Sequence, residues 1–176
     1  NPYAAAAVRK LATKVIGTGM TPRLIMLDPK DTRIKAAKDD WKEFIANSDP
    51  EGQTTFDGQM KVAARCWFES GEALLRLIPR PSAWGLRVPL QVQVLEGDHL
   101  DSLKNESLAG GGAIVQGVEF DAFGRRVAYW LFDEHPGDSL FGQPIRGAGR
   151  SSFQSRRVPA REILHLFEAL RPGQAR

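Results

Sequence analysis

The chain is 176 residues long, with 42% hydrophobic and 26% charged residues and a formal net charge of +3 at pH 7. This composition is typical of a soluble globular protein with one ordinary core or two small ones, and it argues against disorder throughout. The N-terminal region has no apolar stretch of membrane-spanning length or signal-peptide type, so we expect no membrane partner and no secretory route. The single cysteine, Cys66, excludes an internal disulfide and a thiolate-rich zinc site.

Three amphipathic helices are predicted in the first two fifths of the chain. The first covers residues 1–16, because Asn1 is a good cap, Pro2 suits the first turn and Gly17 ends the pattern. The second runs from residue 28 or 31 to about 46, and the third from residue 54 or 55 to 70. Each of these helices has a stripe of apolar residues that is expected to face the core, and Cys66 lies on the stripe of the third helix. The short apolar segment 24–27 is a candidate strand.

The sequence pattern changes from helical to β after Gly71. Segments 72–78 and 89–95 are predicted strands, and in the second we expect Gln91 and Gln93 to face outward between apolar neighbours. Segment 98–112 is polar and ends in three glycines, which predicts a mobile loop. The last strand, 163–167, is apolar on both faces, so we expect it to be central in its sheet or packed against the helices.

Residues 117–132 predict a β-hairpin. Two runs rich in β-forming residues are joined by residues 121–124, where Asp121 starts the turn and Gly124 takes a positive φ. Neither run supplies a catalytic group, so this well-specified segment is architectural. The predicted fold class is α+β, with three N-terminal helices packed on a mostly antiparallel β-rich subdomain. We expect a helical part, residues 1–71, and a β-rich part, residues 72–176, that together form one structural unit.

A segment rich in arginine, residues 141–161, contains no acidic residue. Its five arginines are Arg146, Arg150, Arg156, Arg157 and Arg161. One interpretation is a solvated loop, because glycines and a proline interrupt the segment. The other is a contact with an acidic partner, either nucleic-acid phosphate or a carboxylate-rich protein surface, since guanidinium groups suit both. Only Phe153 accompanies the arginines, which gives little support to a platform for stacked bases.

Two short patterns and one histidine suggest chemistry, and each has a plainer interpretation. Residues 137–140 spell Gly-Asp-Ser-Leu, a signature of one class of esterases with Ser139 as nucleophile, but no buried strand precedes them. The only later histidine, His165, lies in an apolar strand, so we expect a hydrogen-bonded core or interface residue. Histidines and acids in segments 98–101 and 133–138 could form a metal site, although solvated loops are the better interpretation, because such loops are common by chance. The sequence therefore predicts no enzyme, no cofactor and no metal.

Several segments, taken in order, resemble the lambda-type portal proteins of tailed bacteriophages and prophages. They are residues 1–3, 15–19, 89–101 (PLQVQVLEGDHLD), 117–132 (GVEFDAFGRRVAYWLF), 135–138 and 158–174 (VPAREILHLFEALRPGQ). The similarity runs over nearly the whole chain, which makes it more specific than any single motif. Full portals are considerably longer, and their stem helices, clip and crown would follow the last of these segments. The resemblance therefore implies the wing region of a portal, and we expect the chain to be a piece of a longer protein.

The resemblance implies a structural subunit without catalytic activity. Such a subunit would form a homo-oligomeric, usually twelve-fold, ring at one vertex of the capsid, in contact with the major capsid protein. Double-stranded DNA would pass through its tunnel during packaging and ejection. A terminase with its own ATPase would dock on the ring, and head-completion proteins would later replace it. The implied location is the virion, and the host cytoplasm during assembly or where a prophage encodes the protein.

In such a portal the arginine-rich segment is expected to contact a protein, because the wing of related portals points outward, away from the DNA. A competing hypothesis is a monomeric β-rich module that binds nucleic acid or an acidic protein through the segment from Arg146 to Arg161.

Overall fold

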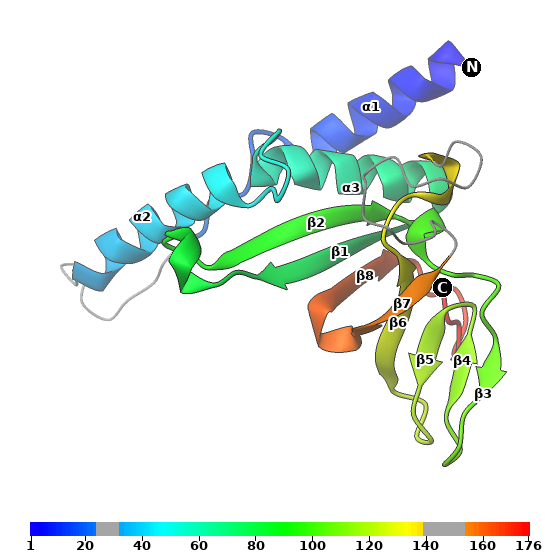
Figure 1. Cartoon of the computed structure of the whole chain (residues 1–176). Helices are drawn as coiled ribbons and strands as arrows, with labels where there is room; N and C mark the ends of the chain where they lie inside the picture. The colour runs from blue at the N-terminus through cyan, green and yellow to red at the C-terminus, as the bar shows by residue number, and fades with distance from the viewer. Residues whose placement is uncertain (24–31, 139–153) are drawn as a thin grey trace. The chain divides into compact units, whose positions relative to one another are not determined.

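The computed structural model describes residues 1–23, 32–138 and 154–176 (Figure 1). This part of the chain contains three long helices followed by eight strands in two antiparallel sheets, so the predicted α+β class is confirmed. The helices are α1 (Pro2–Ile16), α2 (Thr32–Asn47) and α3 (Phe56–Ser70). The strands are β1 (Glu72–Pro79), β2 (Leu90–Glu96), β3 (Glu106–Ser107), β4 (Ala113–Val115), β5 (Val118–Phe120), β6 (Arg126–Phe132), β7 (Ser155–Pro159) and β8 (Ile163–Phe167).

The chain divides into two compact units, which are described separately. The first comprises residues 1–69 and 77–94, and the second comprises residues 70–76 and 95–176. Strand β1 therefore begins in the second unit and ends in the first. The strand orders are β2-β1-β8 in one sheet and β3-β4-β5-β6-β7 in the other.

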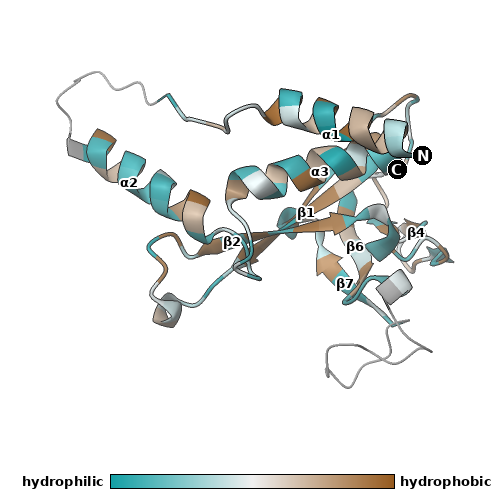
Figure 2. Cartoon of the chain, turned by 90° about the horizontal axis from the view of Figure 1, so that it is seen from above, coloured by the Kyte–Doolittle hydropathy of each residue, from teal (hydrophilic) through white to brown (hydrophobic). Residues whose placement is uncertain are grey.

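The helices of the first unit begin and end close to where the sequence predicts. The side chain of Asn1 accepts a hydrogen bond from the Tyr3 amide at 3.0 Å, and the Gly17 amide donates to the Thr13 carbonyl at 2.8 Å. Helix α2 begins at residue 32, and hydrophilic and hydrophobic residues alternate along it in Figure 2. The candidate strand 24–27 lies outside the described residues. Cys66 on α3 is buried, as predicted.

An aromatic cluster joins α2 and α3 in the first unit. The ring centroids of Trp41 and Phe44 on α2 lie 5.8 and 5.1 Å from that of Phe56 on α3. The indole of Trp41 also donates a hydrogen bond to the Met20 carbonyl at 3.2 Å, so the chain that follows α1 is attached to the same cluster.

The prediction that Gln91 faces outward is wrong. Gln91 is only 7% exposed, and its side-chain amide nitrogen donates to the carbonyls of Asn47 and Asp49 at 2.9 and 3.1 Å. Its amide oxygen accepts a hydrogen bond from Arg80 at 2.7 Å. A buried amide is tolerated here because its donors and acceptor are satisfied, and it ties β2 to the segment that follows α2.

The hairpin predicted at residues 117–132 is confirmed in the second unit as β5 and β6. One carboxylate oxygen of Asp121 accepts hydrogen bonds from the amides of Phe123 and Arg125, both at 2.9 Å. Gly124 has φ of 78°, a conformation that side chains with a Cβ disfavour. The segment 98–112, predicted as a mobile loop, is more ordered than expected, because it contains β3, which pairs with β4.

The core of the second unit lies between β1, β8 and the five-stranded sheet. Eight buried residues form it: Leu74, Leu95, Leu100, Val118, Tyr129, Leu131, Val158 and Ile163. Strand β8 pairs antiparallel with β1 and is the last strand of its sheet. The prediction that it is central is therefore wrong, and Leu164 and Leu166 on its second face are 54% and 37% exposed.

Candidate partner-contact surface

The structure separates the five arginines that the sequence groups together. Arg146 and Arg150 lie outside the described residues. Arg156 and Arg157 lie on β7, so this part of the predicted loop is a strand paired with β6. Arg161 is exposed in the short 3₁₀ helix η4 (Ala160–Glu162), between β7 and β8. Because neighbouring residues of a strand point to opposite faces, Arg156 and Arg157 cannot form one surface patch.

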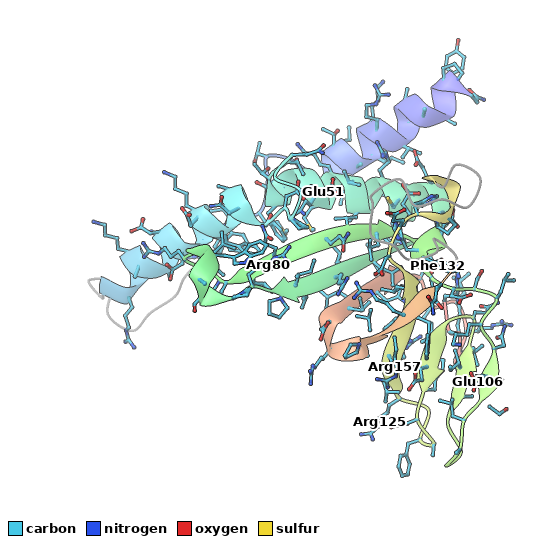
Figure 3. All side chains as sticks on the ribbon, in the orientation of Figure 1. Glu51, Arg80, Glu106, Arg125, Phe132 and Arg157 are labelled. Carbon is cyan, nitrogen blue, oxygen red and sulfur yellow. The ribbon has the colours of Figure 1, made fainter. Side chains whose placement is uncertain are left out.

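Arg157, which is labelled in Figure 3, is bound by a carboxylate of its own sheet, that of Glu119. Its Nε and Nη2 donate to the two oxygens of Glu119 at 2.8 and 2.7 Å, in the forked geometry that is strongest for guanidinium and carboxylate groups. Trp130 donates from its indole nitrogen to Glu119 at 3.1 Å. The hydrogen bond from Arg157 lowers the pKa of Glu119, and the same bond raises the pKa of Arg157.

A further cation completes this arrangement. The ammonium of Lys104 lies 4.1 Å from the centroid of the Trp130 ring, which is close enough for a cation–π interaction. Lys104, Trp130, Glu119 and Arg157 thus form a connected group of alternating charge and aromatic surface. Sequence analysis missed Glu119, although an acid between Val118 and Phe120 in a strand is an unusual feature that could have indicated a partner.

Arg156 is held on the opposite face of β7 by an ion pair with Asp133. Beside it, the hydroxyl of Ser155 donates to Asp101 at 2.5 Å. The two arginines of β7 are therefore both paired with carboxylates of the same chain. Among the candidate arginines in the described part of the chain, Arg161 is exposed and is not seen to pair with a carboxylate.

Two of the polar segments weighed as a metal site do meet in the second unit. One ligand atom each from Glu96, Asp98 and His135 lies within 4.8 Å of the others, and the ring of His99 is 5.4 Å from that of His135. However, the Gly137 amide donates to Nδ1 of His135 at 3.0 Å. The neutral ring then carries its proton on Nε2, which lies 3.7 Å from both carboxylates. This arrangement fits a histidine facing two acids better than a metal ligand.

His165 has the hydrogen-bonded core position that the sequence predicts. Its side chain is 3% exposed, and its Nε2 lies 3.0 Å from Glu72, which also pairs with Arg176. Burial alone would raise the pKa of Glu72. The hydrogen bond of His165 and the charge of Arg176 outweigh this effect, so the pKa is lowered. Ser139, the nucleophile of the esterase hypothesis, lies outside the described residues.

Comparison with known proteins defines the class of the chain. A family model described as phage portal protein, lambda family, matches residues 1–176. A probable portal protein of Halomonas phage phiHAP-1 is 30% identical over 182 residues, which cover 99% of this chain and 33% of that relative. The class is that of phage portal proteins. More specifically, the chain belongs to their lambda family, and it spans about a third of the length of this relative. The resemblance drawn from the sequence is thereby confirmed.

The described helices include none that is both long and apolar enough to cross a lipid bilayer.

Proposed function

We propose that the chain is the wing region of a structural portal subunit that assembles into a ring at one capsid vertex. The family match over residues 1–176 carries this proposal. In it, residues 1–71 form the helical part and residues 72–176 the β-rich part of the wing. The assembled ring conducts double-stranded DNA during packaging and ejection, and it is the docking site for the packaging ATPase and the head-completion proteins.

The chemistry of the described residues supports a role in assembly and not in catalysis. His165, a residue of the esterase hypothesis, is enclosed and paired with Glu72. The polar groups at Glu96, Asp98 and His135 face one another, and the hydrogen bond at Nδ1 orients the ring against metal binding. A buried and paired set of polar groups, such as His165 with Glu72, specifies how strands meet.

The arginine-rich segment is proposed to contact a protein, either a neighbouring subunit or the capsid. Arg156 and Arg157 carry their own carboxylate partners, so they add little net positive charge for phosphate groups. This pairing weakens the alternative of a monomeric module that binds nucleic acid through these residues.

The test is the oligomeric state of the intact gene product. Mass photometry and electron microscopy are expected to show closed rings, and monomers at all concentrations would contradict the proposal. A duplex-DNA titration distinguishes the portal from the alternative, the monomeric module that binds nucleic acid. It compares the wild type with variants in which Arg156, Arg157 and Arg161 are replaced by Ala. Monomers whose salt-dependent DNA affinity falls in these variants would establish the nucleic-acid module instead.

A further inference from the structure

The four outer strands of the two sheets are protected to very different degrees. Edge strands expose unpaired amides and carbonyls, and natural proteins usually protect them with charges, prolines, short length or a covering segment. Three of the four edges in the described part of the chain have such protection, whereas β8 does not.

The edge of β2 is covered within the first unit. The Val92 amide donates to the Ser48 carbonyl at 2.8 Å, and the Val92 carbonyl accepts from the side chain of Gln59 on α3 at 2.5 Å. A loop and a helix therefore occupy the positions that an added strand would need.

The two edges of the five-stranded sheet are protected by composition. Strand β3 has two residues, both exposed, and its Glu106 pairs with Lys104. Strand β7 carries Arg156, Arg157 and Pro159 within five residues. Charge and proline both oppose the addition of a further strand.

Strand β8 has none of these features. Its sequence, Ile-Leu-His-Leu-Phe, contains no proline, no glycine and no Asp, Glu, Lys or Arg. Leu164 and Leu166 are 54% and 37% exposed. In residues 1–23, 32–138 and 154–176, one backbone hydrogen bond outside the strand pairing reaches β8, from the amide of its first residue, Ile163, to the Ala160 carbonyl. From residue 164 onward the printed backbone pairing of β8 is with β1 on one side. The sequence of β8 is that of a central strand, and its place in the sheet is that of an edge.

We propose that the free edge of β8 pairs with an extended segment of a neighbouring portal subunit, which adds a strand to the β2-β1-β8 sheet. The backbone fixes the shape of this partner, because only an extended chain matches the spacing of the amides and carbonyls along a strand. The leucines fix its chemistry, because an uncharged segment with apolar residues at alternate positions would cover them. This inference rests on the ring assembly of the proposed function.

The neighbour cannot contribute its own β8 in a closed ring. Antiparallel pairing of β8 with a second β8 is a two-fold contact, which closes a dimer, whereas a ring requires two different surfaces on each subunit. The added strand therefore comes from another segment. In the Halomonas phage relative, two thirds of the chain lie outside the matched region and offer such segments.

Amide hydrogen exchange tests the pairing directly in the intact gene product. In an edge strand, alternate amides point away from the neighbouring strand, so only about half of the β8 amides exchange slowly. Residue-resolved exchange is measured on ring and monomer fractions separated by size. The Ile163 amide is already bonded to the Ala160 carbonyl, so the test uses residues 164–167. We expect alternating protection over these residues in the monomer and slow exchange at all of them in the ring.

Each other pattern of exchange contradicts the inference. Alternating protection that persists in the ring would show that no strand is added. Full protection already in the monomer would assign the added strand to the same subunit. Two-fold dimers that protect β8 would assign it to a second β8.

A pair of variants provides an independent test of assembly. Leu164→Lys with Leu166→Lys places charges on the edge and leaves the core face of β8 unchanged, and we expect at least a tenfold loss of rings at unchanged circular dichroism. Leu103→Lys is the control, because Leu103 is 91% exposed in the loop before β3. Unchanged ring formation in the double variant would overturn the inference. If the wild-type protein forms no rings, the proposed function fails, and the β8 contact to a neighbour fails with it.

Discussion

Glu72 and His165 form a buried pair that joins the first and last strands of the second unit. The carboxylate and Nε2 are 3.0 Å apart, and the two side chains are 8% and 3% exposed. The residues belong to neighbouring strands, because Glu72 is opposite Phe167 and Leu74 is opposite His165. Arg176 contacts the other oxygen of Glu72, so one carboxylate holds β8 and the segment that follows it.

Replacement of Glu72 by Gln should destabilise the fold by about 1.5–3 kcal/mol at pH 7, the usual worth of a hydrogen bond to a charged group. The pKa of Glu72 is lowered from its ordinary 4.5. A lowered pKa means that the carboxylate stabilises the fold fully above about pH 4.5 and loses this effect as the pH falls through the folded value. Urea denaturation at pH 7 and pH 3 should therefore show a smaller difference between wild type and variant at pH 3. Glu168→Gln, at an exposed position, is the control, and an equal difference at both pH values would contradict the assignment.

Gly97 lies against the same carboxylate, which predicts a second effect. A Cβ on Gly97 would approach Cγ and Cδ of Glu72 to 2.8 and 2.9 Å. His165 and Arg176 restrain Glu72, so the side chain cannot simply move away, and Gly97→Ala should cost about 1–3 kcal/mol. A double-mutant cycle with Glu72→Ala checks the cause. The cost of Gly97→Ala should fall below about 0.5 kcal/mol in that background, and an unchanged cost would mean that another contact is responsible.

The local elements of this fold could be predicted from the sequence, whereas its strand pairing could not. The cap at Asn1 and the turn of Asp121 and Gly124 depend on residues within about four positions of one another, which a sequence pattern contains. Arg157 and Glu119 are separated by 38 positions, and their contact depends on the register of β5, β6 and β7. An arginine-rich segment without acids therefore suggested a free cationic loop, although the arginines of β7 find their acids on β5 and directly after β6.

The position of β8 could not be predicted for a related reason. Apolar residues on both faces indicate that a strand is covered on both faces, but they do not identify the covering segment. Gln91 was predicted in the opposite sense. A polar residue in an alternating strand indicates a side chain that faces solvent, but Gln91 is buried and donates to the carbonyls of Asn47 and Asp49.

Gln59 on α3 should be important for the first unit although it is polar. Its amide oxygen accepts from the hydroxyl of Ser48 at 2.7 Å, and its nitrogen donates to Val92. Gln59→Leu would leave both partners buried and unsatisfied, at a cost of about 1–3 kcal/mol for each group. Thermal unfolding should show this loss, and Ser48→Ala in the same chain should recover part of it. Gln53→Leu, at an exposed position, should change stability by less than about 0.5 kcal/mol. Equal effects of the two glutamine replacements would contradict the role of Gln59.

The Arg157 and Glu119 pair predicts an acid-dependent stability that belongs to the five-stranded sheet. In Arg157→Ala, the carboxylate of Glu119 keeps only the hydrogen bond from the indole of Trp130 among these two partners. The replacement should lower the free energy of unfolding by about 1–2 kcal/mol at pH 7. The lower value is favoured because Arg157 is 47% exposed, and solvent weakens exposed ion pairs. Arg157→Lys should recover only part of this, because an ammonium cannot make the forked contact.

The pKa of Glu119 is lowered from 4.5 by Arg157, so the stabilisation is complete above about pH 4.5 and disappears as the pH falls through the folded value. The variant and the wild type should therefore converge in urea midpoint at pH 3. Arg161→Ala is the matched control, since Arg161 is exposed on η4 and should change the midpoint little at either pH. If Arg161→Ala is as costly as Arg157→Ala, the stability of this sheet depends on the total positive charge of the segment and not on the forked pair.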